Sequence, residues 1–299
     1  MLRINNKLGF LPHILYVVCA GGFFMLALLT ISTSHRGGVL SFVRYLRRDR
    51  IITEDRSFMG INIRHIRYIH NRGRINWRRI HRKAETTELL CGEDVYIPSD
   101  SGMKKFEPWE FRSRLCANAG LEILRQMRCV PPSLRIGLYD PKGEVQDMPR
   151  HILRLTNNLV VVTDNRNLYM EQAGILMEEM GAVLRVSCGV SELFDCGLVI
   201  APGGIDRRLS LRSDSVVLCP QLPMVSLRGQ VYFRYEVELS EGLSEFCPGE
   251  IGSDVLAGGL YSLCGVYELG ALSPANLSCG REGVTPSVIS NYLEECFGT

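Results

Sequence analysis

The chain lacks the short motifs that mark many hydrolases, nucleotide-binding enzymes and metalloproteases. Its 299 residues contain no G-x-S-x-G, no G-x-x-x-x-G-K-[ST] and no H-E-x-x-H, so it offers no nucleophile elbow, phosphate loop or zinc helix. Histidine is also scarce: of six histidines, only His151 follows residue 85. Acid–base chemistry by histidine therefore has one candidate in that region, and it lies inside a predicted helix.

Cysteine is abundant, but the spacing that binds zinc or supports disulfide exchange is missing. None of the eleven cysteines forms a C-x-x-C pair, which argues against a zinc knuckle and against a thioredoxin-like site. An odd number of cysteines in a chain of this size is typical of free thiols in a reducing compartment. We expect most of them to be small core residues.

The chain has little net charge, yet its charges are unevenly distributed. The formal net charge is +2. Residues 36–84 carry 14 Lys and Arg against three acidic residues, whereas the residues from Glu85 onward carry 18 against 29. The first region is strongly basic and the second is acidic, which predicts two regions with different partners.

Residues 134–205 carry the pattern of a parallel sheet with crossover helices. Apolar runs alternate with helical stripes, and the run NLVVVT is nearly all β-branched or aliphatic, as expected for a strand covered on both faces. Between the runs, the sequence predicts helices over 145–155 and from Asn165 to Met180. The expected strands are 134–139, 158–163, 182–187 and 197–204, with a short helix at 191–194.

The segment from LRIGLY through VVTDN and EEMGA to SELFDCGLVIAPGG resembles the nucleotide-binding half of Rossmann-type dehydrogenases, over roughly a quarter of the chain. The resemblance implies a doubly wound α/β fold with NAD or NADP as cofactor. In such domains the ligand lies at the carboxyl ends of the strands. The cofactor-binding candidates at these positions are Asp140, Gly143, Asp164, Gly203 and Gly204.

Three of these candidates have roles that the resemblance implies. Asp164 lies 21 residues after Gly143, near the ~20 expected for an acidic residue that binds the adenosine ribose. Gly203 and Gly204 would let the backbone lie beside the nicotinamide. The alternative is structural, with Asp164 and Asn165 starting a helix and the glycines only turning the chain.

The phosphate-binding turn of that family is missing. The first strand is followed by Asp140-Pro141-Lys142-Gly143-Glu144 rather than by G-x-G-x-x-G. Proline has no N–H to donate, and two carboxylates stand where a diphosphate would bind. Asp140 and Asp164 could together hold a metal ion across adjacent strand ends, although we predict no metal site.

A long apolar run lies near the N-terminus. Residues 9–31 contain no Asp, Glu, Lys or Arg and, as a helix, would reach ~34 Å, enough to cross a bilayer. Arginines follow the run closely, so by the positive-inside rule the bulk of the protein faces the cytoplasm. The sequence therefore predicts a single-pass protein of the cell membrane. A cleaved signal peptide and a true start at Met59 are the alternatives.

Residues 36–84 are predicted to be a basic juxtamembrane linker with interleaved aromatic residues. Beside a membrane span, such a segment favours contact with anionic lipid, worth ~1 kcal/mol per basic residue near the surface. A solvated linker and a nucleic-acid contact are the alternatives, and no nucleic-acid motif supports the latter.

Two regions flank the predicted core, which we extend over 134–225 to include a strand at 215–219. Residues 85–133 are predicted to form a loop and a covering helix with Pro108 in its first turn. Gly120 lies inside this helix, where it would permit close packing against the sheet. A small α+β extension is predicted for 226–299, with a strand at 231–239 and helices at 255–269 and 287–297.

These patterns predict an α/β protein with a doubly wound, mainly parallel Rossmann-like sheet. It follows an N-terminal tail, 1–35, that contains a transmembrane helix at 9–31. Because the phosphate turn is missing, we expect a membrane-anchored cytoplasmic protein whose degenerate Rossmann-like domain binds a ligand or a partner. The alternative is an NAD(P)-dependent oxidoreductase or another nucleotide-binding enzyme.

Overall fold

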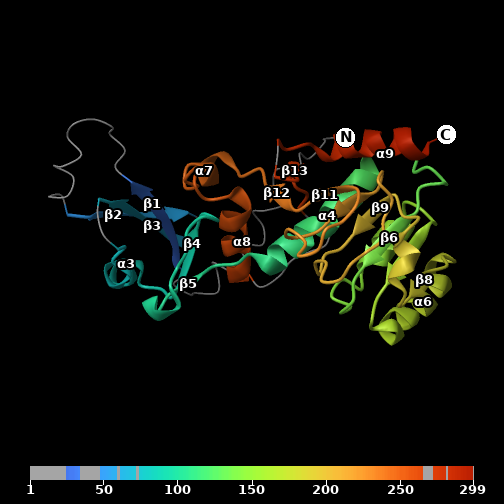
Figure 1. The fold of residues 1–299 in the computed structure, drawn as a ribbon, viewed down its shortest axis with the longest axis horizontal. Coiled ribbons are helices and arrows are strands. Elements are labelled where there is room, and N and C mark those ends of the chain that lie inside the picture. Colours follow the sequence, from blue (N-terminus) through green and yellow to red (C-terminus); the bar gives the residue numbers. More distant parts are fainter. Residues whose placement is uncertain are drawn as a thin grey trace. The chain divides into compact units, whose positions relative to one another are not determined.

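The computed structural model describes residues 25–33, 48–58, 61–71, 74–264, 272–280 and 282–298. The chain divides into two compact units. The first comprises Met1–Pro108 and Leu239–Val266, and the second comprises Trp109–Glu238 and Tyr267–Thr299. Each unit has a sheet of its own (Figure 1). Both units are thus assembled from two separate stretches of the chain.

The first unit contains a five-stranded sheet in the order β2-β3-β1-β4-β5. β2 is antiparallel to β3, and the other neighbouring strands are parallel. β1 therefore lies in the middle of the sheet, between β3 and β4. The strand bounds are β1 (Met25–Thr33), β2 (Arg50–Phe58), β3 (Ile61–His70), β4 (Glu88–Cys91) and β5 (Lys104–Lys105).

β1 has apolar side chains on both faces because both faces of its sheet are covered. Leu26 and Leu28 belong to one core, which also contains residues of α7 and α8. Ala27 and Leu29 belong to a second core, which contains residues of α3. A continuous apolar run is the pattern that such a central strand requires. The three helices are α3 (Trp77–Ala84), α7 (Glu241–Ser244) and α8 (Ser253–Cys264).

The predicted transmembrane helix at 9–31 is wrong over residues 25–31, which belong to β1. Residues 9–24 of that prediction lie outside the described residues. Within the part of the chain that the structure describes, no helix has both the length and the apolar character needed to cross a membrane. The apolar residues of β1 suit a buried strand as well as a helix, and the choice depends on β3 and β4, which pair with β1 from positions far along the chain.

The basic segment predicted to be a linker is folded where the structure describes it. β2 and β3 pair from Arg50 opposite Ile69 to Phe58 opposite Ile61. The last residues of the segment form α3. The alternating run INIRHIRYIH is thus a strand with four buried and two exposed residues, and its side chains are directed to opposite faces of the sheet.

The second unit is built on a six-stranded parallel sheet in the order β8-β7-β6-β9-β10-β11. Counted along the chain this order is 3-2-1-4-5-6, as in doubly wound dinucleotide-binding domains. The predicted parallel, Rossmann-like α/β sheet is confirmed. The bounds are β6 (Ile136–Tyr139), β7 (Leu159–Val162), β8 (Arg185–Ser187), β9 (Leu198–Ile200), β10 (Val216–Leu218) and β11 (Gln230–Tyr232).

The helices of the second unit form close to the predicted positions, with one difference in length. Gly181 ends α6 in the left-handed conformation, with φ of 63°. α5 (Met148–Leu153) is shorter than the helix predicted over 145–155, and residues 143–145 instead form a turn whose N–H groups donate to the carboxylate of Asp140. The longer helices are α4 (Trp109–Gln126), α6 (Arg166–Met180) and α9 (Pro286–Phe297).

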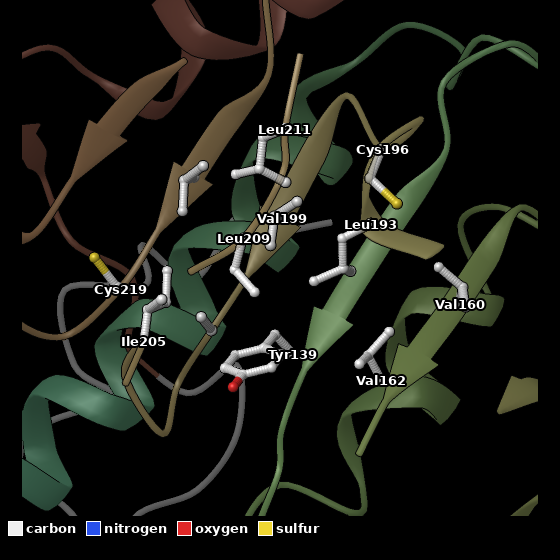
Figure 2. Close-up of a cluster of buried hydrophobic side chains, with 12 residues drawn as sticks. Tyr139, Val160, Val162, Leu193, Cys196, Val199, Ile205, Leu209, Leu211 and Cys219 are labelled. Atoms are coloured by element: carbon white, nitrogen blue, oxygen red, sulfur yellow. The ribbon is translucent and has the colours of Figure 1, made fainter. Parts of the chain in front are cut away.

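The two faces of this sheet are covered in different ways. Helices α4 and α5 pack on one face. On the other face, η3 (Val190–Leu193) and the loop 205–211 contribute side chains to a core that includes Tyr139 and Val199 of the strands (Figure 2). The connections from β9 to β10 and from β10 to β11 contain no helix. Loops therefore replace crossover helices in this half of the sheet.

The C-terminal residues do not form one extension of the core. The strand predicted at 231–239 is divided into β11 and β12 (Arg234–Glu236), and β12 pairs antiparallel with β13 (Asn276–Ser278). α8 belongs to the first unit, whereas β13 and α9 belong to the second. Sequence periodicity identifies an apolar helix face but does not say which core that face joins.

Two mid-helix glycines lead us to expect opposite responses to the same substitution. A Cβ added at Gly120 in α4 would lie 2.3 Å from Cδ1 of the buried Ile200, whereas one added at Gly174 in α6 would meet nothing within 4 Å. We expect Gly120→Ala to destabilise the second unit by about 1–2 kcal/mol through overpacking. We expect Gly174→Ala to stabilise it by about 0.5–1 kcal/mol, because alanine favours the helix.

Urea unfolding measures the free energy of unfolding of both glycine variants. The chain has two tryptophans, and a Trp77→Phe background leaves Trp109 as the fluorescent reporter of the second unit. The same response to both substitutions would contradict close packing of α4 on β9.

Candidate functional site

The candidate site lies at the carboxyl ends of β6 and β9, where the strand order of the sheet reverses. Ligands of doubly wound sheets bind outside the strands at this switch point. β6 and β9 are neighbours, with Leu138 opposite Ile200. The chain leaves them at Asp140 and Ala201, and the end of β7 lies on the other side of β6.

Asp140 is fully buried, and its carboxylate organises the turn after β6. Oδ1 accepts hydrogen bonds from the N–H groups of Gly143 and Glu144, each at 3.0 Å, and Oδ2 accepts one from Val145 at 2.9 Å. Oδ2 also accepts a hydrogen bond from the hydroxyl of Tyr169 at 2.6 Å. Turn amides that would face a phosphate in a dinucleotide-binding domain are thus bonded to a carboxylate of the protein itself.

The turn depends on Gly143 and on Tyr169 of α6. Gly143 has a φ of 79°, and a Cβ there would lie 2.6 Å from Cδ2 of Leu168. Burial raises the pKa of the Tyr169 hydroxyl, and the charge of Asp140 raises it further. The hydroxyl therefore keeps its proton at neutral pH and donates it in the hydrogen bond to Asp140.

Tyr139, the last residue of β6, contributes its ring to the core and its hydroxyl to the strand ends. In Figure 2 the ring lies within the apolar cluster and the hydroxyl oxygen points away from it. This hydroxyl donates to Oδ1 of Asp206 at 2.9 Å. Burial and the bond to Asp206 raise the pKa of Tyr139, and the same bond lowers the pKa of Asp206. The pair is a neutral phenol and a carboxylate, and neither group titrates near neutral pH.

Arg207 joins the end of β7 to the loop after β9. Its guanidinium donates to both carboxylate oxygens of Asp164, at 2.7 and 3.3 Å, and its Nε contacts Oδ1 of Asp206 at 3.4 Å. The hydrogen bonds to Asp164 raise the pKa of Arg207. The carboxylate that the resemblance assigns to a ribose is therefore engaged by an arginine.

Gly203 and Gly204 turn the chain after β9. The N–H of Gly204 donates to the carbonyl of Ala201 at 2.9 Å, and Gly204 has a φ of 79°. A Cβ on Gly204 would lie 3.1 Å from Cη2 of Trp109, and a Cβ on Gly203 would lie 3.5 Å from Oε2 of Glu144. An indole and a carboxylate therefore lie against the two glycines.

The five residues predicted from the sequence lie together at this edge of the sheet. The carboxylates of Asp140 and Asp164, however, form hydrogen bonds with other groups of the protein. Prediction from the sequence misses Tyr139, Tyr169, Asp206 and Arg207. The signal that could have found two of them is the charged pair Asp206-Arg207, which follows the glycine turn almost directly. The strand-end cluster is defined as Tyr139, Asp140, Asp164, Tyr169, Asp206 and Arg207.

Comparison with known proteins leaves the activity open. No family model matches the chain. No curated protein matches it either. Among solved structures, the ligand-free form of a 5-ketofructose reductase from a Gluconobacter strain is similar with a TM-score of 0.31 and 10% identity, over 92% of this chain and 100% of that one. A similarity with so low a TM-score does not establish the fold, so the fold is assigned from the strand order.

The residues at the strand ends do not fit a bound dinucleotide. Three amides of the first turn are bonded to Asp140, and Glu144 in the same turn pairs with Lys142 at 3.6 Å. Asp140 and Asp164 each bind protein donors rather than facing a shared ion. Across the described ranges, no group of three or more His, Cys, Asp or Glu could hold a metal ion. The strand-end cluster is arranged to hold the strand ends together.

Proposed function

We propose that the second unit is a non-catalytic binding module whose Rossmann-like sheet keeps its strand order while side chains of the protein take the place of a dinucleotide. The observation that carries the proposal is the carboxylate of Asp140, which binds three turn amides and the hydroxyl of Tyr169. A diphosphate would have to take these donors from a buried carboxylate. Replacing Asp140 by a diphosphate as the acceptor is unfavourable, because the carboxylate of Asp140 would stay buried without hydrogen-bond partners.

A nucleotide-dependent oxidoreductase is the second candidate. It is favoured by the strand order and by the position of Asp164 after β7, the second strand, where acidic residues of such enzymes bind a ribose. For this role the Asp164 carboxylate would have to leave Arg207, or Arg207 would have to bind the 2′-phosphate of NADP. The two candidates differ in one measurable property, which is saturable binding of a dinucleotide.

Calorimetric titration of the full-length protein with NAD⁺, NADH, NADP⁺ and NADPH separates the two candidates. We expect no saturable heat, which corresponds to dissociation constants weaker than about 1 mM. The reason is that the amides needed for phosphate binding are already bonded to Asp140. A saturable response that is lost in Asp164→Ala would overturn the proposal in favour of the oxidoreductase.

The Arg207→Ala variant tests which part of the site prevents binding. If the arginine alone blocks the ribose position, this variant gains saturable binding of a dinucleotide. If the bonded turn amides are the cause, the variant gives no more heat than the parent, and this is the result that we expect. Gain of binding in Arg207→Ala would therefore contradict the role assigned to Asp140.

A further inference from the structure

The first unit presents a strongly basic helix that the proposed function does not use. α3 has the sequence WRRIHRKA and contains no acidic residue. Where the structure describes the chain, no carboxylate lies within ion-pair distance of Arg78, Arg82 or Lys83. The side chains that α3 exposes are Arg78, Arg79, His81, Arg82 and Lys83.

Both ends of α3 are held in place by side chains. At its N-terminus, the side chain of Asn76 accepts a hydrogen bond from the N–H of Arg79, and the N–H of Asn76 donates to the hydroxyl of Tyr68, each at 3.1 Å. At its C-terminus, the guanidinium of Arg64 donates to the carbonyl of Lys83 at 3.0 Å. The basic side chains therefore stand on a helix whose position in the first unit is fixed.

The cationic side chains on α3 repel one another. Arg78 and Arg79 lie in the first turn, where the helix dipole favours acidic side chains. Arg78 with Arg82, and Arg79 with Lys83, are like-charged pairs four residues apart, each unfavourable by roughly 0.2–0.5 kcal/mol. A bound polyanion would remove these unfavourable interactions. A local conflict of this kind is expected where a surface serves binding rather than stability.

The surroundings of α3 discriminate between two kinds of polyanion. Ile80 and Ala84 are fully buried and Trp77 packs against the same core, so α3 has no free apolar face to insert into a bilayer. Successive helix residues are about 100° apart, so Arg78, Arg79, Arg82 and Lys83 span an arc of about 140°, and His81 extends it to about 200°. A flat lipid surface would contact one side of such a helix. A groove with phosphates on both walls would contact two sides of it.

We propose that α3 binds the phosphate backbone of duplex DNA, with its exposed side in the major groove and its basic flanks toward both strands. A helix with its side chains is ~10–12 Å wide, and the major groove of B-form DNA is ~12 Å wide. The major groove of A-form RNA is too narrow for this arrangement. Three of the four cationic side chains are arginines, whose planar fork matches phosphate oxygens. Phosphate contacts carry no base information, so binding does not depend on sequence.

The proposal is tested by fluorescence anisotropy of the full-length protein with a labelled duplex of about 20 base pairs, measured over a series of salt concentrations. Glutamine keeps the helix propensity while removing charge. We expect the quadruple variant to lose about 100-fold in affinity at low salt, and its slope of log K against log salt to fall by about 3–4. The quadruple variant carries Arg78→Gln, Arg79→Gln, Arg82→Gln and Lys83→Gln.

Two further variants control for net charge and for folding. A second quadruple variant removes four exposed arginines of the second unit, and we expect it to stay within about threefold of the parent with an unchanged salt slope. An Arg→Lys triple variant at positions 78, 79 and 82 keeps the charge and is expected to keep the slope. Urea unfolding verifies that each variant folds, with Trp77 as the fluorescent reporter of the first unit and Trp109 as that of the second. The control substitutions are Arg128→Gln, Arg154→Gln, Arg166→Gln and Arg228→Gln.

Three results would overturn the proposal. Equal losses in the two quadruple variants would show attraction by net charge alone. An affinity for single-stranded DNA or duplex RNA equal to that for duplex DNA would exclude binding in the major groove. If anionic phosphatidylserine vesicles bind in an α3-dependent manner and duplex DNA does not compete, the partner is a membrane surface. None of these results bears on the dinucleotide titration, which tests the second unit separately.

Discussion

Asp140→Ala is expected to lower the free energy of unfolding of the second unit by roughly 3–5 kcal/mol. The substitution removes the side-chain acceptor of three backbone N–H groups and of the Tyr169 hydroxyl, in a place where Asp140 is 0% exposed, although the N–H of Gly143 keeps the carbonyl of residue 140 at 3.3 Å. Each buried donor without a partner costs about 1–3 kcal/mol, and relaxation of the turn recovers part of the loss. The measurement is urea unfolding followed by Trp109 fluorescence in the Trp77→Phe background.

Two variants control the Asp140 experiment. Asp140→Asn keeps the shape and one acceptor oxygen, so we expect it to lose about half as much stability as alanine. Asp195→Ala removes an exposed carboxylate of the same unit and should change the free energy of unfolding by less than about 0.5 kcal/mol. If Asp140→Ala unfolds like Asp195→Ala, the carboxylate does not hold the turn, and the proposed function loses its main support.

Leu28→Ala and Leu29→Ala are each expected to destabilise the first unit by about 2–5 kcal/mol. The two side chains are adjacent in β1, are both 0% exposed and lie in different cores on opposite faces of the sheet. A cavity on either face is therefore costly. Urea unfolding in a Trp109→Phe background, with Trp77 of α3 as reporter, measures the effect.

The matched control for β1 is Ile52→Ala in the edge strand β2. Ile52 is 38% exposed, so its truncation should cost less than about 1 kcal/mol. If residues 25–31 were part of a membrane helix, truncating Leu28 would not change the unfolding of the rest of the first unit. Losses similar to that of Ile52→Ala at both leucines would thus contradict the placement of β1 in the sheet.

The parallel sheet of the second unit is predictable because its pattern is local. Strands such as 158–163 are short apolar runs between helical stripes, and the crossover helix with Asn165 before it and Gly181 after it has recognisable ends. The order 3-2-1-4-5-6 follows from few alternatives once parallel strands alternate with crossovers. The length of α5 is less predictable, because the turn bonded to Asp140 before it leaves no mark in the apolar periodicity.

The central strand of the first unit is not predictable in the same way. MLALLTIST becomes a strand because β3 and β4 pair with it and because helices cover both of its faces. Alone, the run has the composition of a membrane segment. The charged alternation of β3 likewise has the composition of a linker until the strand beside it is known. Strand pairing is decided by partners that lie far apart in sequence.

The sequence by itself determined the α/β character of residues 134–205, the missing phosphate turn and the uneven charge, because each is a property of neighbouring residues. Only the tertiary structure decided that Asp140 is bonded to its own turn, that Arg207 pairs with Asp164, and that the basic residues 78–83 stand on an anchored helix. These are contacts between segments separated by many residues or by a turn whose geometry the whole fold sets. Their partners are chosen by the packing of the sheet rather than by local preference.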